Sequence, residues 1–258
     1  MPGNPHLHQN TESGKTLLSR LRKAAPVCFA ILYAVFALVF SGVFRFYFAA
    51  MLLYLAAVMY YNFFYLRRRG LYTFWSWLRP LFFFASLAAI YFVLPSAGLR
   101  AVFLLLSALL IYFSEKSLHV ISEQSVFLQT LFSYFGISLG IFALNFYFLP
   151  QTAVILLALL ALTYLAGRSS FENVPQSPEK KNFYSALIAF GLTEIAWALM
   201  FLPLHFTVLA AIAFCAFYSL WMLSYYRLFN NLSGKKVSFY ILFPAIIIAV
   251  IFISTPWR

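Results

Sequence analysis

The sequence predicts an all-α protein: a polytopic integral membrane bundle of about nine transmembrane helices, with a hairpin-repeat organisation, its N-terminus in and its C-terminus out. The first observation behind this prediction is composition, since 64% of the 258 residues are hydrophobic and only 9% are charged. Soluble domains carry about 25% charged residues. A chain so poor in charge cannot cover its surface with groups that water solvates, so that surface must face lipid.

Apolar runs and the breaks between them place the spans, each of about 20 residues. A polar, basic tail at 1–23 comes first, and we expect it in the cytoplasm. Residues 24–258 then form a single transmembrane helical domain. The first span lacks a convincing small-residue cleavage site, so we interpret it as a retained signal anchor. The spans are expected at 24–41, 45–66, 78–95, 100–120, 125–149, 152–167, 182–202, 205–226 and 237–255.

The second observation is the distribution of the 18 Lys and Arg residues. With the N-terminus inside, all of them fall in cytoplasmic segments except Arg45, Arg100 and Arg258. Cytoplasmic loops of membrane proteins carry such an excess of basic residues. The net charge of +12 is therefore a topology signal. It indicates a bilayer with anionic headgroups on the cytoplasmic side as the partner, and no nucleic acid.

A repeat is visible in the spans that run outward. They end at Pro95, Pro150, Pro203 and Pro256, which are 55, 53 and 53 residues apart. The near-constant spacing favours a repeated helical hairpin, although prolines also end unrelated helices. Before the third span, 71–79 contains two tryptophans and is either a short interfacial helix or an extension of that span.

The acidic residues exclude several classes of membrane enzyme. All six acids are glutamates, so prenyltransferases, CDP-alcohol transferases and aspartyl peptidases, which need aspartates, do not fit. The sequence contains no P-loop, dinucleotide fingerprint or HExxH motif, and we expect no cofactor. Cys28 and Cys215 lie in apolar runs without CxxC spacing, and we interpret them as packing or lipid-facing thiols.

One acid lies inside an apolar run. Glu194 is the twelfth residue of 183–202, about 12 Å below the outer edge of the bilayer core at 1.5 Å per residue. An ionised acid there costs a few kcal/mol, so we expect it to face other helices, protonated or paired. This intramembrane acid is either a proton or cation site or a structural hydrogen bond between helices. The partners considered are Asn145, Gln129, His205 and Arg100.

A second polar group follows the fourth apolar run. Glu115, His119 and Glu123 are spaced i, i+4 and i+8, which places them on one face of a continuous helix at the inner leaflet. Such a face could bind a divalent cation or relay protons. The alternative is the solvated end of a helix.

The fifth span contains a helix-packing motif. Gly136 and Gly140 form GxxxG, which allows close approach of another helix, and we expect packing there rather than a substrate groove. The connection at 167–182 is the longest and most polar between spans. We expect that connection to be flexible.

The C-terminal half resembles an uncharacterised family, a domain of unknown function found in multi-pass membrane proteins of candidate-phylum bacteria. The run Glu194-Ile195-Ala196-Trp197 and its following Pro203 is similar to a family pattern of Glu-Leu-Ala, an aromatic residue and Pro. The ending Ser-Thr-Pro-Trp-Arg is similar to a family Thr-Thr-Arg-Trp-Arg. The chain departs from the family at 115–124, where an Asn-rich segment is expected. The resemblance implies a bacterial lineage and marks Glu194, and it implies no activity.

Three functions remain from different classes. The pattern favours an integral membrane protein of the cell (inner, cytoplasmic) membrane that is a non-enzymatic component or assembly subunit, with other membrane subunits or its own copies as partners. A small transporter would use Glu194 as its coupling site. A lipid-modifying enzyme would use Glu115, His119 and Glu123 at the inner leaflet.

Overall fold

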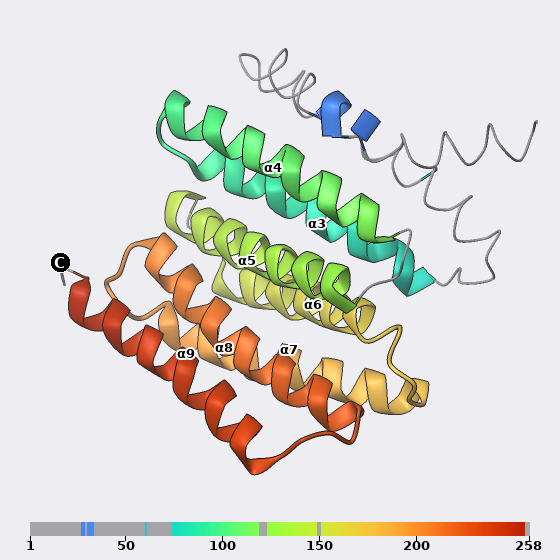
Figure 1. Cartoon of the computed structure of the whole chain (residues 1–258). Helices are drawn as coiled ribbons and strands as arrows, with labels where there is room; N and C mark the ends of the chain where they lie inside the picture. The colour runs from blue at the N-terminus through green and yellow to red at the C-terminus, as the bar shows by residue number, and fades with distance from the viewer. Residues whose placement is uncertain are drawn as a thin grey trace, which may run out of the picture. The chain divides into compact units, whose positions relative to one another are not determined.

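The computed structural model describes residues 27–28, 30–33, 60, 74–118, 123–148 and 151–255. All regular structure in these residues is α-helical, which confirms the predicted class for the described part of the chain. Most of the expected spans 24–41 and 45–66, with the basic tail before them, lies outside the described residues. The helices are α3 (Phe74–Val93), α4 (Ala97–Leu118), α5 (Glu123–Phe148), α6 (Thr152–Ser170), α7 (Pro178–Leu199), α8 (Phe206–Leu228) and α9 (Gly234–Ser254) (Figure 1).

Five of these helices are long and apolar enough to cross a membrane, by length and composition. They are α5, counted from Val126, and α6 to α9, whereas α3 and α4 contain the shorter apolar stretches Leu78–Val93 and Ala97–Phe113. The described chain is therefore that of a multi-pass, all-helical membrane protein. Each helix overlaps one of the seven spans expected after residue 78.

The helix ends differ from the ends of the apolar runs. α6 continues to Ser170 and α7 begins at Pro178, because polar residues at these ends are held by contacts that an apolar run does not reveal. α3 begins at Phe74 and continues through Pro80. Residues 74–79 therefore extend the third span and do not form a separate interfacial helix.

The chain divides into two compact units. One comprises Met1–Val58 and Ala97–Ser125, and it contains α4. The other comprises Met59–Ser96 and Val126–Arg258, and it contains α3, α6 to α9 and nearly all of α5. The single transmembrane domain expected over 24–258 stays a prediction. Every contact described below lies within the second unit.

The second unit is held by packing between antiparallel neighbours. α6 packs against α3 and α7, and α8 lies between α7 and α9 (Figure 1). At the core, the ring of Tyr134 in α5 stacks on Phe217 in α8, with centroids 3.8 Å apart and planes 7° apart. Ile188 and Leu192 of α7 complete this core. Such close packing matters because lipid tails are as apolar as the side chains, so dispersion and polar contacts must hold the helices together.

The GxxxG glycines of α5, Gly136 and Gly140, face α3. A Cβ atom on Gly136 would overlap Ser86 of α3, including its backbone, whereas a Cβ on Gly140 would make an ordinary contact of 3.7 Å with Ala89. At the same crossing the Ser86 hydroxyl donates to the carbonyl of Ser133, 2.7 Å away. The close approach of α3 and α5 therefore requires glycine at position 136.

Replacement of Gly136 by alanine should lower the free energy of unfolding by about 1–3 kcal/mol, because the added methyl forces α3 and α5 apart. Gly140→Ala is the matched control, since its methyl finds room, and it should leave stability unchanged or slightly raised. Thermal unfolding of both variants in mild detergent measures the difference. Equal melting temperatures for the two variants would contradict the close helix approach.

Candidate functional site

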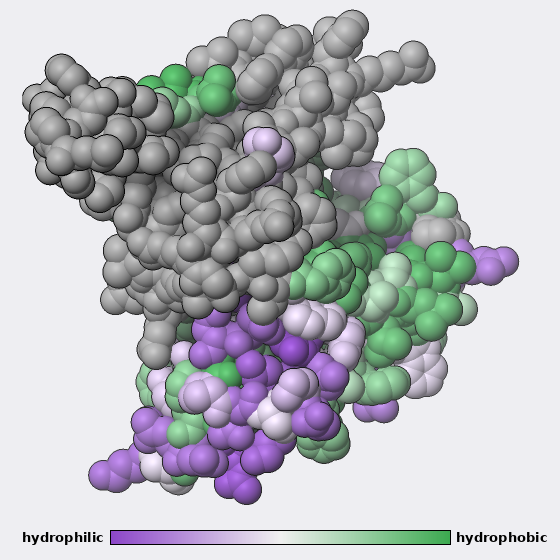
Figure 2. Space-filling view, turned by 90° about the vertical axis from the view of Figure 1, so that its right-hand side faces the viewer, coloured by the Kyte–Doolittle hydropathy of each residue, from purple (hydrophilic) through white to green (hydrophobic). Residues whose placement is uncertain are grey.

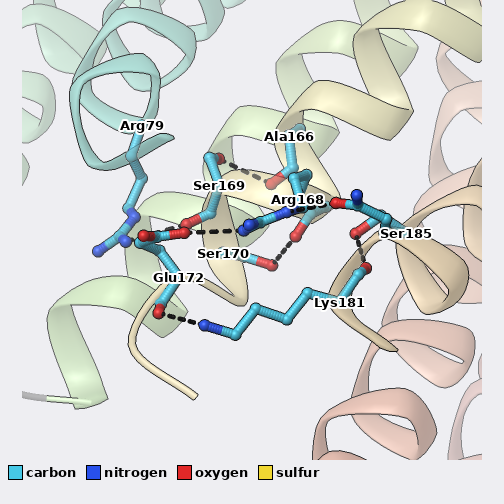
Figure 3. A network of polar contacts seen from close by, with 10 residues as sticks. Arg79, Ala166, Arg168, Ser169, Ser170, Glu172, Lys181 and Ser185 are labelled. Carbon is cyan, nitrogen blue, oxygen red and sulfur yellow. Dashed lines mark hydrogen bonds and ion pairs between the residues drawn. The ribbon is translucent and has the colours of Figure 1, made fainter. Parts of the chain in front are cut away.

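A buried group of charged residues lies where α6 meets α7, and we call it the basic cluster: Arg79, Arg168, Glu172 and Lys181 (Figure 3). Both arginines are only 5% exposed and Lys181 is 8% exposed. Charged side chains are seldom this buried unless they are paired. Its three cations and one carboxylate therefore need individual explanation.

Arg168 has the largest number of partners in the basic cluster. Its Nη1 lies 2.8 Å from Oε2 of Glu172, one helical turn further on, and its Nε donates to Oδ1 of Asn182 over 2.7 Å. Its guanidinium also lies over the Trp75 ring, 4.7 Å from the centroid. One side chain thus connects α6 to α7 and to α3, in a planar geometry that favours arginine over lysine.

The other two cations bind backbone carbonyls. Arg79 donates from Nη2 to the carbonyl of Ser169 over 2.9 Å, and Lys181 donates from Nζ to the carbonyl of Glu172 over 2.8 Å. The last carbonyls of a helix have no partner within the helix and carry partial negative charge. Arg79 therefore binds a carbonyl in the last turn of α6, whereas Lys181 binds a carbonyl in the connection, two residues after the helix ends.

Serine hydroxyls complete this helix end. Ser170 donates to the carbonyl of Gly167 over 2.6 Å and accepts the Nε1–H of Trp221 over 2.8 Å. Close beside it, a Cβ on Gly167 would contact Ser185 of α7 at 3.8 Å. The following residues Phe171 and Val174 are buried. The ends of 167–182 thus belong to α6 and α7 and are bound to neighbouring helices, so the connection is shorter than the sequence suggests. Its expected flexibility stays a prediction.

The charged groups of the basic cluster bind one another and the backbone, so they stabilise the fold. Its carboxylate is paired, and all three cations donate to groups of the chain itself. In the residues described here, no group of three or more His, Cys, Asp or Glu side chains could hold a metal ion. Sequence reasoning missed this cluster, although the spacing of Arg168 and Glu172 by four residues at the end of an apolar run is a signal for such a pair.

Further basic residues lie at the same end of the second unit. Lys180 and Arg227 both line a groove of about 500 Å³ between the start of α7 and the end of α8. Lys236 lies 4.3 Å from the Tyr226 ring centroid, at the start of α9. Figure 2 looks onto this end and shows hydrophilic residues gathered on it. Among the described residues of the second unit, these basic residues, which the sequence assigns to one side of the membrane, thus lie at one end.

Glu194 lies on the exposed side of α7, so the expectation that it faces the interior of this bundle is wrong. The buried side of α7 consists of Lys181, Ser185, Ile188, Ala189, Leu192, Ala196 and Leu199. Glu194 follows Leu192 by two residues, which is about 200° around the helix, the opposite face. Of the partners considered for it, Asn145 and His205 line a separate groove of about 820 Å³ that does not include Glu194.

The predicted inner-leaflet face is divided between two helices. Glu115 belongs to α4, which ends at Leu118, and Glu123 is the first residue of α5. The two glutamates therefore do not share one continuous helix face in the described residues. His119 lies outside the described residues, so the metal or proton-relay hypothesis has no contact to support it.

Comparison with known proteins adds no relative. No protein-family model, no curated protein and no solved structure matches this chain. The assignment of function therefore rests on the residues themselves.

Replacement of Arg168 by lysine keeps the charge but loses the simultaneous contacts with Glu172, Asn182 and Trp75. We expect the free energy of unfolding to fall by about 1–3 kcal/mol, the scale of charged hydrogen bonds. Lys180→Arg is the matched control, because Lys180 is exposed and makes one 3.3 Å bond, to Gln176. Chemical denaturation in detergent compares them, and a lysine variant as stable as the control would remove the structural role of Arg168.

Proposed function

We propose that this chain is a non-enzymatic component of a membrane, an assembly subunit that associates with other transmembrane helices. The observation that carries the proposal is the position of Glu194, an acid on the outward face of a helix that is long and apolar enough to span a bilayer. Exposure of an ionisable group to lipid costs a few kcal/mol. A partner helix that covers Glu194 would remove this cost.

The surroundings of Glu194 favour assembly over transport. A coupling acid of a transporter lines a pathway between helices, near the interface of its repeats. Glu194 lines neither the groove at Lys180 and Arg227 nor the groove at Asn145 and His205. It lies instead among exposed apolar side chains, with Phe190 60% exposed and Trp197 52% exposed. A transporter that uses Glu194 remains the second candidate, and it would require a pathway completed by another chain.

The topology belongs to the same proposal. Nine spans, with the N-terminus in and the C-terminus out, place the basic end of the second unit at the cytoplasmic surface of the cell membrane. Anionic headgroups would then meet Lys180 and Arg227 in their groove, each worth about 1 kcal/mol near a charged surface. The resemblance at 194–203 to a family of bacterial membrane proteins is compatible with a bacterial cell membrane and implies no activity.

A photo-reactive amino acid tests the assembly function. Placed at Phe190 beside Glu194, it should crosslink to protein in native membranes, because a partner helix covers that face. Placed at Phe243 on the exposed side of α9, it should react with lipid only. Gel mobility and mass spectrometry of the products distinguish the two. Lipid adducts at both positions would contradict the assembly function.

Cysteine labelling tests the topology. In a variant without Cys28 and Cys215, a cysteine at the exposed Gln151 should react with a membrane-impermeant maleimide added outside intact cells. A cysteine at the exposed Asn231 should react only after the membrane is permeabilised. The reverse pattern would overturn the orientation, and labelling of both from outside would overturn the span count.

A further inference from the structure

We infer that the exposed face of α7 binds a transmembrane helix that carries a lysine or arginine at the depth of Glu194. The inference rests on the proposed assembly function and names the chemistry of the partner. Its basis is an acid in the middle of a regular apolar stripe. We call this stripe the α7 seam: Phe183, Leu187, Phe190, Glu194 and Trp197 of α7, with Phe201 in the turn that follows it.

The α7 seam has the spacing of a helix-packing surface. Its members within α7, from Phe183 to Trp197, are separated by four, three, four and three residues, an average of 3.5. This is the repeat that keeps a stripe against a neighbouring helix at a shallow left-handed crossing. All its apolar members are exposed, from 52% at Leu187 and Trp197 to 71% at Phe201.

The same helix shows that this spacing supports packing. The seam on the opposite face, which includes Ser185, Ile188, Leu192 and Leu199, is displaced by two residues and is buried inside the second unit. α7 thus has two faces with the same periodicity, and only one is covered within the described residues. The uncovered face contains the acid.

The depth of Glu194 keeps its carboxylate from water. It lies five residues before Leu199, the last residue of α7, or about 8 Å along the helix axis. Phe190 and Trp197 flank it one turn away on either side, and Trp197 contacts Phe201 edge to face, with ring centroids 5.5 Å apart. In a membrane-spanning α7, these aromatic side chains would surround the carboxylate with apolar neighbours.

The chain offers Glu194 no partner among its described residues. The carboxylate makes no ion pair or side-chain hydrogen bond there. The hydroxyl of the adjacent Thr193 already donates to the carbonyl of Ala189 over 2.8 Å. Within the described residues, a charged Glu194 therefore has no neutralising group, and a molecule that covers the seam would supply one.

Charge complementarity selects a basic helix as that molecule. At low dielectric an opposite charge stabilises the carboxylate, whereas a second copy of this chain would bring another acid against it. The exposed side of α9 provides the contrast, because α9 has no acidic or basic side chain after Lys236. Lipid can cover the apolar side chains of α9 without cost. It cannot neutralise the carboxylate in the α7 seam.

The experiment uses the full chain and a single-span polyleucine test helix, fused to a fluorescent domain that fixes its orientation. The test helix carries one lysine at the depth of Glu194, or leucine or glutamate at that position. Energy transfer in membranes of cells that express both proteins reports association. Wild type should bind the lysine helix roughly tenfold more tightly than the leucine helix. Glu194→Leu should abolish this preference, and Glu194→Lys should transfer it to the glutamate helix.

A relocated acid is the matched control. Val250 is 57% exposed on α9 and lies four residues before the last residue of that helix, as Glu194 lies five before the last residue of α7. The double variant Glu194→Leu/Val250→Glu should not regain binding of the lysine helix, because the seam is missing around the new acid. Equal binding by the double variant and wild type would overturn the inference, since any lipid-exposed acid would then suffice.

The outcomes separate this inference from the proposed function. If wild type forms dimers that Glu194→Leu abolishes, and ignores the lysine helix, the occupant is a second copy; the inference fails and the assembly function stands. If wild type ignores every test helix but the probe at Phe190 crosslinks to protein, a partner of other chemistry occupies the seam, and only the inference fails. If neither association nor crosslinking occurs, both proposals fail.

Discussion

The C-terminal end of α6 is the point on which the second unit depends. A helix that stops near the edge of a bilayer leaves carbonyl groups that lipid cannot satisfy. Here Arg79 of α3 binds the carbonyl of Ser169 in the last turn of α6, and Lys181 of α7 binds the carbonyl of Glu172, two residues after the helix. Arg168 then fixes the same place through Glu172 and Asn182. These hydrogen bonds fix the positions of α3, α6 and α7 along their axes. The apolar packing further along α6 and α7 is consistent with those positions.

The two faces of α7 show how one helix can serve two kinds of neighbour. Its inward face uses small and aliphatic residues and approaches α6 closely, as at Gly167 and Ser185. Its outward face uses large aromatic residues and one acid. The inward contacts are completed by the chain itself, whereas the outward face is chemically incomplete within the described residues. The inward face of α7 therefore holds the fold together, and the outward face is the surface that we propose for partner binding.

The helices were predictable because apolar runs of sufficient length leave few alternatives in lipid. The orientation of a helix about its own axis was less predictable. Both faces of α7 are apolar, so hydropathy does not say which face is turned inward. Only the cost of exposing Glu194 to lipid suggested that its face is covered. That cost does not say whether the same chain or another chain covers it. The basic cluster was missed for a different reason. The sequence of 167–182 shows that the segment is polar. It does not show that Arg168 and Lys181 have buried hydrogen-bond partners. The third span was expected from residue 78, yet α3 begins at Phe74, and its first turn contacts α6 through Trp75 and Tyr164.

The division of the basic cluster between α6 and α7 has a consequence for biosynthesis. Glu172 follows Arg168 by four residues and is available to it almost at once, whereas Asn182 and Lys181 are made only when α7 has begun. Until then the carbonyl of Glu172 has no lysine to bind it. With Arg79 of α3 already made, the synthesis of α7 supplies the Asn182 and Lys181 contacts of the basic cluster, so we expect α6 and α7 to enter the membrane as a pair.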